Sequence, residues 1–505
     1  MTRNSLRIPL SVIGAAFGGV LLAAAYAPLN LWILAPVGLA IIIAIQWGSS
    51  VRLGFFTGLI FGFVSFFAQH FWLGVVGTDA HLILSVYLAL WIAIIGAGSS
   101  YVSRRLPPLL AIFAIAGLWV TEEALRGRYP FGGYPWARVV FSQADSPLSH
   151  WSTIAGVPFV TAVVVLIAAA IAMVLRKSSV RNLTISLVVV ALAGGVPLFI
   201  SSSTNSNSQI VISVIQGGTP QIGMGAMDVR RAVLDNHVDE TLILAEKVKS
   251  GEEPQPDLVL WPENSSDINP YLDDSAYQAI TSAAQAIRVP ILVGAVVDSF
   301  ENPETEVYNM GILWDPITGP GETYIKNAPV PFGEFIPFRS VLTKFISRYD
   351  RVPRDFAHGK EPGIFTVNGV TLGDLICFEV AVDRVVNRVV SDGAGVLLVQ
   401  TNNATYANSA LPVQQLNIER IRAIEMGQSV VVAATTGISA AIDENGNVIS
   451  QLTDGEVGSF TYTAPVSNNR TLGSFTGPWL ELFIVVVTVF SLTLVAFSGR
   501  KHRQG

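Results

Sequence analysis

Three residues of the chain have the side chains that acyl-transfer chemistry needs. Cys377 is the only cysteine among 505 residues, and it ends an apolar run that begins at Thr371. Glu263 closes a second apolar run, and Lys326 follows a third stretch. A thiol becomes a nucleophile when a base removes its proton, a carboxylate can be that base, and an ammonium can stabilise the resulting oxyanion. Each residue alone has an ordinary structural interpretation, as a buried thiol, a strand cap and a surface lysine. Together they predict a cysteine-dependent acyl-transfer site.

The base for the thiol is more plausibly a carboxylate than an imidazole. The six histidines lie away from the ends of these runs in the sequence, so we interpret Glu263 as the base for Cys377. The backbone N–H of Phe378 is a second candidate donor to the oxyanion, beside Lys326. The spacing of His, Asp and Glu contains no metal-ligand pattern, and we expect neither a metal nor a cofactor.

The elements that must position these residues read as an α/β domain. Short runs rich in Val, Ile and Leu alternate with helical patterns, which predicts strands buried on both faces of a sheet with covering helices. The predicted strands are Gln209–Ile215, Asp257–Trp261, Pro290–Val297, Val307–Trp314, Thr371–Cys377, Val396–Gln400, Ser429–Ala434 and Ile438–Ile442. The predicted helices are 228–249, 274–287, 380–391 and 411–427. Because ligands bind beyond the carboxyl ends of such strands, we expect Glu263 and Cys377 to share one cleft.

The composition places the rest of the chain in lipid. Half of the residues (51%) are hydrophobic and 13% are charged, about half of the charged share of a typical soluble protein. Apolar runs of membrane-spanning length are predicted at 8–26, 31–47, 53–76, 82–102, 106–125, 157–175, 183–200 and 479–498. The first run has no clear cleavage site and leads straight into the second, so we interpret it as retained. The net charge of −6 gives no electrostatic case for a nucleic-acid partner.

Basic residues decide the orientation, because cytoplasmic loops carry an excess of Lys and Arg. With both termini inside, the inside segments hold Arg3, Arg7, Arg52, Arg104, Arg105, Arg176, Lys177, Arg181, Arg500, Lys501 and Arg503. The short outside loops hold Arg126, Arg128 and Arg138. We therefore predict seven transmembrane helices within 1–200, a linker at 201–208, an extracytoplasmic catalytic domain at 209–470, an eighth span at 479–498 and a cytoplasmic tail at 499–505.

Several motifs resemble those of a known superfamily. Trp261-Pro262-Glu263, the Lys326 segment leading to Pro331-Phe332-Gly333-Glu334, and Ile376-Cys377-Phe378-Glu379 are similar to the Glu, Lys and Cys motifs of the nitrilase (carbon–nitrogen hydrolase) superfamily. Insertion of such a domain between seven spans and one resembles the bacterial apolipoprotein N-acyltransferases, the membrane-embedded members of that superfamily. The segments Glu123-Ala124-Leu125-Arg126-Gly127 and Gly133-Tyr134-Pro135-Trp136 are similar to that family's fifth span and loop.

The resemblance implies a fold and a set of roles. The expected fold is an eight-helix transmembrane bundle carrying an extracytoplasmic nitrilase-like α-β-β-α sandwich. Cys377 would be the nucleophile, Glu263 the general base and Lys326 the oxyanion-stabilising cation. Supporting roles would fall to Glu334, Phe378, Glu379 and Asn402. The chain departs from the family pattern at three positions, with Phe378 in place of Tyr, and Gly225 and Thr405 where aromatic residues are expected.

The activity implied by the resemblance is transfer of a fatty acyl chain through a Cys377 thioester. The donor would be a membrane phospholipid, and the acceptor the α-amino group of diacylglyceryl-cysteine on an apolipoprotein. The enzyme would sit in the bacterial cytoplasmic membrane among membrane lipids, with its catalytic domain on the extracytoplasmic face. No nucleic acid is expected as a partner.

Two other functions stay open at this point. A membrane-tethered carbon–nitrogen hydrolase would use the same residues on small amides, with water as the second nucleophile. A transporter with an inactive insert would place ionisable residues inside the spans, and Glu122, Glu123 and His70 lie in or near them.

The stretch 335–351 has a mixed character. It joins apolar residues such as Phe338 and Phe345 to Arg339, Lys344, Arg348 and Arg351. Such a segment is typical of a lid at a lipid interface, and an ordinary core segment is the alternative.

Overall fold

The chain separates into two units. The computed structural model describes residues 7–200, 208–346, 348–349, 352–467 and 469–501. The first unit consists of Met1–Ser201 with Thr471–Gly505, and the second of Ser202–Arg470. The predicted linker 201–208, except Ser208, and the end of the predicted tail lie outside the described residues.

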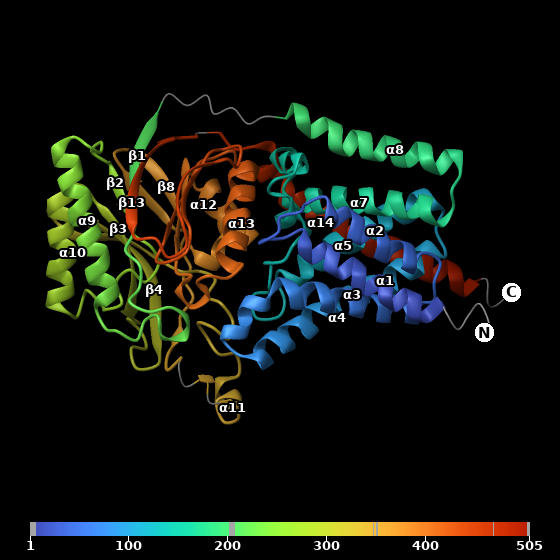
Figure 1. The fold of residues 1–505 in the computed structure, drawn as a ribbon, viewed down its shortest axis with the longest axis horizontal. Helices are drawn as coiled ribbons and strands as arrows, with labels where there is room; N and C mark the ends of the chain where they lie inside the picture. Colours follow the sequence, from blue (N-terminus) through green and yellow to red (C-terminus); the bar gives the residue numbers. More distant parts are fainter. Residues whose placement is uncertain (1–6, 201–207, 347, 350–351, 468, 502–505) are drawn as a thin grey trace. The chain divides into compact units, whose positions relative to one another are not determined.

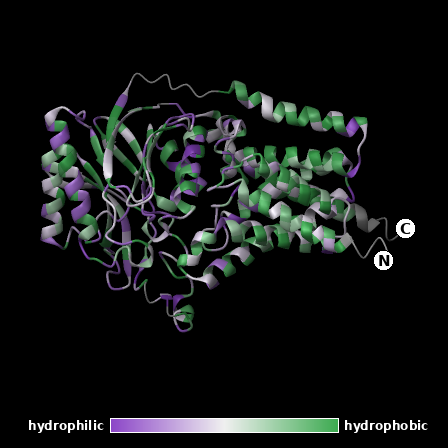
Figure 2. Cartoon of the chain, in the orientation of Figure 1, coloured by the Kyte–Doolittle hydropathy of each residue, from purple (hydrophilic) through white to green (hydrophobic). Residues whose placement is uncertain are grey.

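The first unit is built from apolar helices, which are mainly hydrophobic along their length (Figure 2). Among the described residues, six helical stretches are long and apolar enough to cross a membrane: α3 (Val51–Gln69), α4 (Thr78–Ser103), α5 (Pro108–Arg126), α7 (Val157–Arg176), Val180–Phe199 and Leu472–Phe497. Val180–Phe199 comprises α8 (Val180–Gly195) and a short 3-10 turn, and Leu472–Phe497 belongs to α14 (Leu472–Lys501). Two shorter apolar helices are α1 (Arg7–Ala24) and α2 (Leu34–Gln46). At about 1.5 Å per residue α2 falls short of a hydrocarbon core of about 30 Å. The eight-span topology therefore stays a prediction.

The last helix begins earlier than its apolar run. It starts at Leu472, and the hydroxyl of Thr471 accepts a hydrogen bond from the Ser474 N–H over 3.0 Å at its first turn. Pro478 lies inside the helix. Gly473, Ser474, Thr476 and Gly477 interrupt the apolar residues at the start of α14. The apolar run therefore predicts a start at 479, while backbone geometry extends the helix by about two turns.

Glu122 and Glu123 have polar partners within the first unit. Glu122 accepts a hydrogen bond from Arg126 one turn later on α5, and both side chains are buried. Glu123 accepts from the Val139 N–H over 2.7 Å and from the Thr161 hydroxyl over 2.8 Å. Each of these two buried glutamates therefore has at least one partner inside the first unit.

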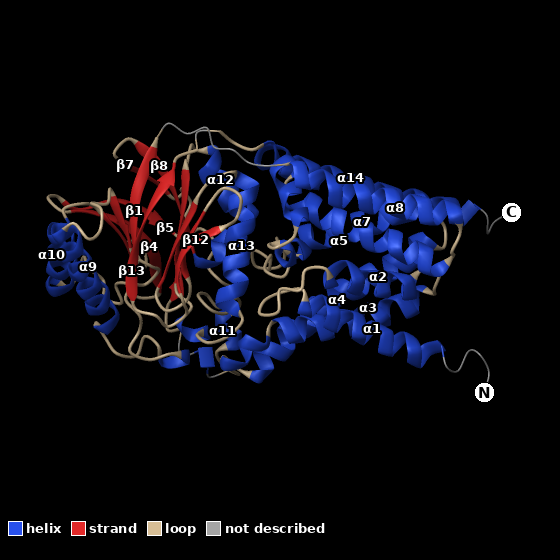
Figure 3. Ribbon diagram, turned by 45° about the horizontal axis from the view of Figure 1, so that its top comes forward, coloured by secondary structure: helices blue, strands red, loops and turns tan. Residues whose placement is uncertain are grey.

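The second unit contains two β-sheets (Figure 3). Among the described residues, the first sheet has the order β13-β1-β2-β3-β4-β5, with β6 beside β4, and the second has the order β12-β11-β10-β9-β8-β7. The strands of the first sheet are β1 (Gln209–Gln216), β2 (Leu258–Leu260), β3 (Ile291–Asp298), β4 (Glu306–Asp315), β5 (Gly319–Ile325), β6 (Asp355–Phe356) and β13 (Gly458–Pro465). Those of the second are β7 (Ile364–Val367), β8 (Val370–Ile376), β9 (Val396–Thr401), β10 (Val430–Ala434), β11 (Ser439–Ile442) and β12 (Val448–Leu452). The trios β1-β2-β3 and β8-β9-β10 are parallel, so their carboxyl ends gather at one edge of each sheet.

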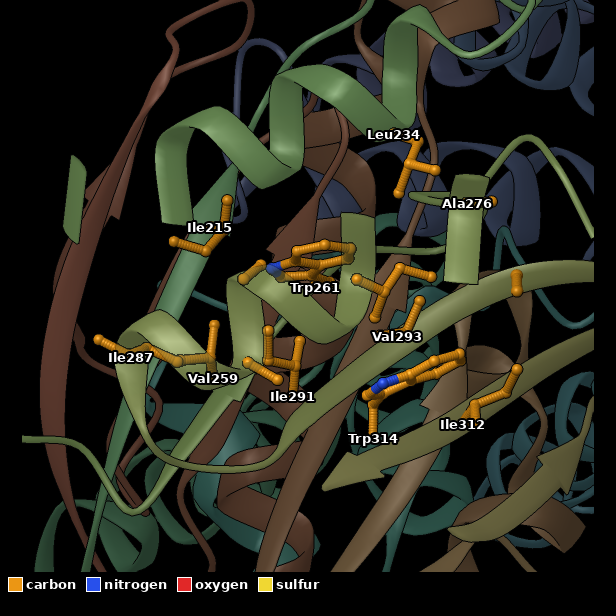
Figure 4. Packing of buried hydrophobic residues seen from close by; sticks show 14 of the residues in the cluster. Ile215, Leu234, Val259, Trp261, Ala276, Ile287, Ile291, Val293, Ile312 and Trp314 are labelled. Atoms are coloured by element: carbon orange, nitrogen blue, oxygen red, sulfur yellow. The ribbon is translucent and has the colours of Figure 1, made fainter. Parts of the chain in front are cut away.

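Helices cover the outer face of each sheet. Helices α9 (Ala232–Ser250) and α10 (Asp274–Ile287) lie on the first sheet, and α12 (Asp383–Ser391) and α13 (Leu411–Met426) lie on the second (Figure 1). The outer layer of the first sheet is a hydrophobic cluster that includes Leu234, Val259, Trp261, Ile287, Ile291 and Trp314 (Figure 4). A second cluster fills the space between the sheets with residues of both, among them Ile212, Leu260, Leu292, Leu372, Leu398 and Val431. The unit is therefore a helix–sheet–sheet–helix sandwich, in which both sheets are buried on both faces.

Candidate active site

Cys377 occupies a strained turn at the end of β8. Its backbone φ is +56°, the left-handed region that L-residues rarely adopt, and it opens the short helix η7 (Cys377–Ala381). The buried guanidinium of Arg422 on α13 holds this turn, donating to the carbonyl oxygens of Val380 over 2.8 Å and of Ala381 over 3.0 Å. The residue Cys377 as a whole is half-buried at the end of the strand. Strain of this kind persists where the surrounding structure enforces it, as at active sites.

Lys326 lies between two carboxylates. It directly follows β5, and its Nζ is 2.9 Å from Glu263 Oε1 and 2.9 Å from Glu334 Oε1. The Lys326 side chain is 1% exposed, that of Glu263 5% and that of Glu334 16%. Burial alone would lower the pKa of Lys326, but the charges of Glu263 and Glu334 raise it well above its usual value. The ammonium is therefore permanently charged and fixed in position.

Two amide groups hold Glu263 in place. The side-chain amide of Asn309 on β4 donates to Glu263 Oε1 over 2.7 Å and to Glu334 Oε1 over 3.0 Å. The backbone N–H of Asn402, just beyond β9, donates to Glu263 Oε2 over 2.9 Å. The second oxygen of Glu334 accepts from the Val330 N–H over 2.6 Å. Charge-assisted bonds of this kind fix both carboxylates against the lysine.

The thiol lies within electrostatic reach of this cluster. Burial, and next the negative charge of Glu263, raise the pKa of Cys377 to about 12, against opposing effects of Lys326 and of a hydrogen bond with Thr401. Cys377 is therefore a protonated thiol at neutral pH and needs a base in order to attack. The structure brings together the three residues that the sequence singles out, although they are distant in the chain.

Glu379 has a different place from that of Glu334. Its Oε1 accepts the N–H groups of Asn327 over 2.7 Å and Ala328 over 2.9 Å, and its Oε2 accepts that of Ile376 over 2.8 Å. The hydroxyl of Tyr324 completes the set at 2.8 Å. The buried carboxylate thus links the segment after Lys326 to the turn of Cys377. Its contacts are those of a structural tie.

The two remaining predicted residues contribute differently. Asn402 holds Glu263 through its backbone, while its side-chain amide lies 3.7 Å from the sulfur of Met227 and its side-chain oxygen accepts the Ala404 N–H. Phe378 is buried beside the thiol, and the donor role of its N–H stays a prediction.

Asn309, Tyr324 and Tyr406 belong to none of the predicted motifs. Asn309 lies on the buried strand β4 and Tyr324 on the edge strand β5. Their polar partners lie elsewhere in the chain, so no local pattern marks them. Tyr406 lies within electrostatic reach of the site. Burial, and next the charges of Cys377 and Glu334, raise the pKa of Tyr406 to about 12. Tyr406 directly follows Thr405, one of the two positions at which the family pattern has an aromatic residue and this chain does not. The other position, Gly225, lies in the short helix η5 (Gly223–Gly225). Among the described residues, no group of three His, Cys, Asp or Glu side chains is placed to hold a metal ion.

The predicted lid segment is buried near its start, where Ile336 is 3% exposed, and presents two exposed aromatic residues further on. Phe338 is 70% and Phe345 81% exposed, on either side of the short helix α11 (Arg339–Leu342). Arg339 pairs with Asp355, which fixes the start of the segment. Arg351 lies outside the described residues. These exposed aromatic rings exclude the ordinary core interpretation for this part of the chain.

Comparison with known proteins identifies both parts of the chain. A family model described as the apolipoprotein N-acyltransferase N-terminal domain matches residues 18–170, and one described as carbon-nitrogen hydrolase matches residues 222–471. An apolipoprotein N-acyltransferase of Mycolicibacterium smegmatis is 40% identical over 284 residues, which is 56% of this chain and 48% of that protein. The chain thus spans about half the length of that relative. One from Vibrio vulnificus is 26% identical over 521 residues, with 97% of each chain covered.

Solved structures give a more distant likeness. An amidase of the nitrilase superfamily from Nesterenkonia AN1 is 17% identical, with a TM-score of 0.38, over 52% of this chain and 93% of that one. The two family models, in contrast, account for most of the chain and for the order of its two parts. The chain belongs to the apolipoprotein N-acyltransferase family, and its second unit is a carbon–nitrogen hydrolase domain of the nitrilase fold.

Proposed function

We propose that this chain transfers a fatty acyl group from a membrane phospholipid to the N-terminal α-amino group of diacylglyceryl-cysteine on apolipoproteins. The observation that carries the proposal is the buried Lys326, held between Glu263 and Glu334 beside a thiol that is protonated at rest. Family membership supports the choice of substrates.

In the first half-reaction Cys377 attacks the ester carbonyl carbon of the phospholipid. Glu263 takes the thiol proton as the S–C bond forms, and the charge on the carbonyl oxygen is stabilised by Lys326 and by the Phe378 N–H. The tetrahedral intermediate then breaks its C–O bond. The glycerol oxygen takes the proton back from Glu263 and leaves as a lysophospholipid, while the acyl group stays on sulfur as a thioester.

In the second half-reaction the neutral α-amino group of the acceptor attacks the thioester carbon. Glu263 takes a proton from the attacking nitrogen, the C–S bond breaks, and the proton returns to the Cys377 thiolate. The product is an amide at the N-terminus of the lipoprotein. Since the donor product leaves before the acceptor reacts, the proposal requires ping-pong kinetics.

The location follows from the substrates. Both are lipid-anchored, so an enzyme with apolar helices is suited to work at the membrane surface. We place the chain in the bacterial cytoplasmic membrane as a multi-pass protein of eight spans, with the catalytic domain on the extracytoplasmic face. The excess of basic residues in the predicted inside segments supports this orientation.

Intact-mass spectrometry tests the covalent step. Wild type and Cys377→Ala, purified in detergent, are incubated with phospholipid and no acceptor. We expect the wild type to gain one fatty-acyl mass that hydroxylamine removes, and the variant to gain none. A synthetic diacylglyceryl-cysteine peptide should then discharge the adduct and itself gain the acyl mass. If neither adduct nor lysophospholipid forms, the phospholipid-donor reaction is wrong and hydrolysis of small amides becomes the better account.

A further inference from the structure

A buried polar pair lies behind the reactive residues and is not used by the mechanism above. Asp374 on β8 and Gln400 on β9 are both fully buried in the apolar layer between the two sheets. A Cβ placed on Gly311 of β4 would lie 2.7 Å from Asp374 Oδ2 and 3.0 Å from Gln400 Oε1. The two side chains of the second sheet therefore converge on one point of the first sheet, where the absence of a side chain leaves room for them.

The orientation of the Gln400 amide is fixed by its other end. Its Nε2 donates to the Trp261 carbonyl over 2.7 Å and to that of Leu292 over 3.3 Å. The reverse orientation would set the side-chain oxygen against two carbonyl oxygens, so Oε1 is the atom that lies beside Gly311, where Asp374 Oδ2 also lies. Within the described residues, Gln400 Oε1 and both carboxyl oxygens of Asp374 have no hydrogen-bond partner. Three acceptor oxygens thus lie in this apolar layer, and the Leu375 N–H is close enough to Asp374 to lower its pKa, though by less than burial raises it.

A single proton resolves this arrangement. We propose that Asp374 is a neutral carboxylic acid that shares its proton with Gln400 Oε1, and that this pair is a positioning element for Glu263 and Cys377. An ionised Asp374 would instead repel Gln400 Oε1 and add a further negative charge near Glu263, Glu334 and Glu379. Burial, and next the charge of Glu379, raise the pKa of Asp374 well above its usual value, in agreement with the neutral form.

The place of the pair in the chain explains what it positions. Asp374 lies on β8, three residues before Cys377, which directly follows that strand. Gln400 lies two residues before Asn402, whose N–H holds Glu263. The carbonyl that Gln400 binds belongs to Trp261, two residues before Glu263. The shared proton keeps Gln400 in this orientation and so fixes the end of β2 against the ends of β8 and β9. The pair acts on the reaction through its neighbours and touches no substrate.

Alkylation of the single thiol by iodoacetamide tests the charge of Asp374. The inference rests on the proposed function only through the roles of Glu263 and Cys377, and this readout needs no substrate. The rate is followed against pH for the detergent-purified wild type and Asp374→Asn. Because a neutral group replaces a neutral group, we expect the same apparent thiol pKa in both. Three residues along a strand span about 10 Å. Loss of a real negative charge at that distance would lower that pKa by about one unit, and this result would overturn the proposal.

Two further variants test the positioning role. Asp374→Leu removes the donor, and we expect alkylation and the kcat of acyl transfer to fall about tenfold each, with KM unchanged. Asp374→Asn, whose amide can donate to Gln400, should restore both. Gly311→Ala forces the two side chains apart and should show the same loss as Asp374→Leu, which covers the case in which the Leu variant does not fold. Equal rates in Leu, Asn and wild-type proteins would overturn the inference. Absence of acyl transfer from every protein, with the alkylation differences intact, would instead count against the proposed function.

Discussion

The hydroxyl of Tyr324 donates a hydrogen bond to Glu379 Oε2 over 2.8 Å, and this contact ties the strand that carries Lys326 to the turn that carries Cys377. The other oxygen of Glu379 accepts two backbone N–H groups directly after Lys326. One buried carboxylate therefore sets the spacing between the cation and the nucleophile.

Removal of this carboxylate should damage both stability and activity. In Glu379→Ala, three buried N–H groups lose their acceptor, at about 1–3 kcal/mol each. We expect the free energy of unfolding to fall by several kcal/mol, and kcat to fall by about 100-fold or more as the cation and thiol separate. Tyr324→Phe, the matched control, removes one donor and should lose about 1 kcal/mol. Chemical denaturation and steady-state kinetics measure the two effects, and equal activity of the two variants would contradict the expectation.

The amide of Asn309 should be required for its N–H donors as well as its shape. It donates to Glu263 and Glu334 at once, and hydrogen bonds to charged groups contribute about 1.5–3 kcal/mol each. Asn309→Leu keeps the bulk, and we expect a loss of about 10- to 100-fold in kcat. Asn309→Asp adds a carboxylate beside two others and should lose more. If Asp were the milder change in kcat, Asn309 would not be a donor to these carboxylates.

The backbone strain at Cys377 should be measurable as a difference in the free energy of unfolding between two variants that lack the thiol. A Cβ in the left-handed region costs about 1–2 kcal/mol relative to glycine, while glycine makes the unfolded chain more flexible by about 0.4–1 kcal/mol. We therefore expect the free energy of unfolding of Cys377→Gly to be about 0.5–1 kcal/mol higher than that of Cys377→Ala. Both should be inactive. A more stable Ala variant would show that the φ of +56° is not held in solution.

The second unit should lose stability in acid because of His237. Its ring nitrogen Nδ1 donates to the Val233 carbonyl over 2.7 Å, and Nε2 accepts the Gly217 N–H over 3.2 Å, which requires a neutral ring. Burial lowers the pKa of His237 from 6.5 to about 4. As the pH falls, the unfolded chain binds a proton at His237 before the folded chain does. The contribution of the neutral ring to the free energy of unfolding is therefore complete above pH 6.5 and is lost as the pH falls toward 4. The expected loss is about 3 kcal/mol.

A matched variant isolates this effect from the titration of other groups. His237→Gln can keep both hydrogen bonds without a titrating ring. The difference in unfolding free energy between wild type and variant, measured at pH 7 and at pH 4, should change by about 3 kcal/mol in favour of the variant. A difference that is constant with pH would show that His237 is protonated in the folded state.

The exposed ring of Phe345 should matter for lipid substrates alone. Phe345→Asp places a charge on a side chain that is 81% exposed, so the fold should be unchanged. We expect KM for phospholipid in vesicles to rise about tenfold or more, because a buried aromatic ring contributes about 1.5–3 kcal/mol at an apolar surface. Cleavage of a water-soluble short-chain ester should be unaffected and serves as the control. Equal loss on both substrates would mean that Phe345 supports the fold rather than lipid contact.

The central strands could be predicted from the sequence, and the edge strands could not. Val396–Gln400 and Thr371–Cys377 are rich in Val, Leu and Ile, and they are β9 and β8 within one residue. The edge strand β5 contains Gly, Pro and Glu, and the edge strand β13 alternates Ser, Thr and Tyr, because one side of an edge strand is unpaired and less buried. Hydropathy reports burial, so it identifies the middle of a sheet more readily than its margins.

A similar limit applies to the site. Glu263, Lys326 and Cys377 could be singled out because reactive side chains are uncommon at the ends of apolar runs. Asn309 and Gln400 could not be singled out in this way. Each binds a partner that is distant in the sequence, Glu263 for Asn309 and the Trp261 carbonyl for Gln400. Tertiary contacts of this type leave no local pattern in the chain.

The pairing of β1 with β13 has a consequence for biosynthesis. The first strand of the catalytic unit pairs with its last, in the register Gln209↔Pro465 to Gln216↔Gly458. A ribosome adding about 5–20 residues per second needs on the order of 10–50 s to make the residues between them. During that interval one side of β1 has no partner, and unpaired strand edges invite aggregation. A nascent chain of this protein therefore carries an open sheet edge until the final helix is about to emerge, which makes the interval before β13 the period in which a chaperone would be of most use.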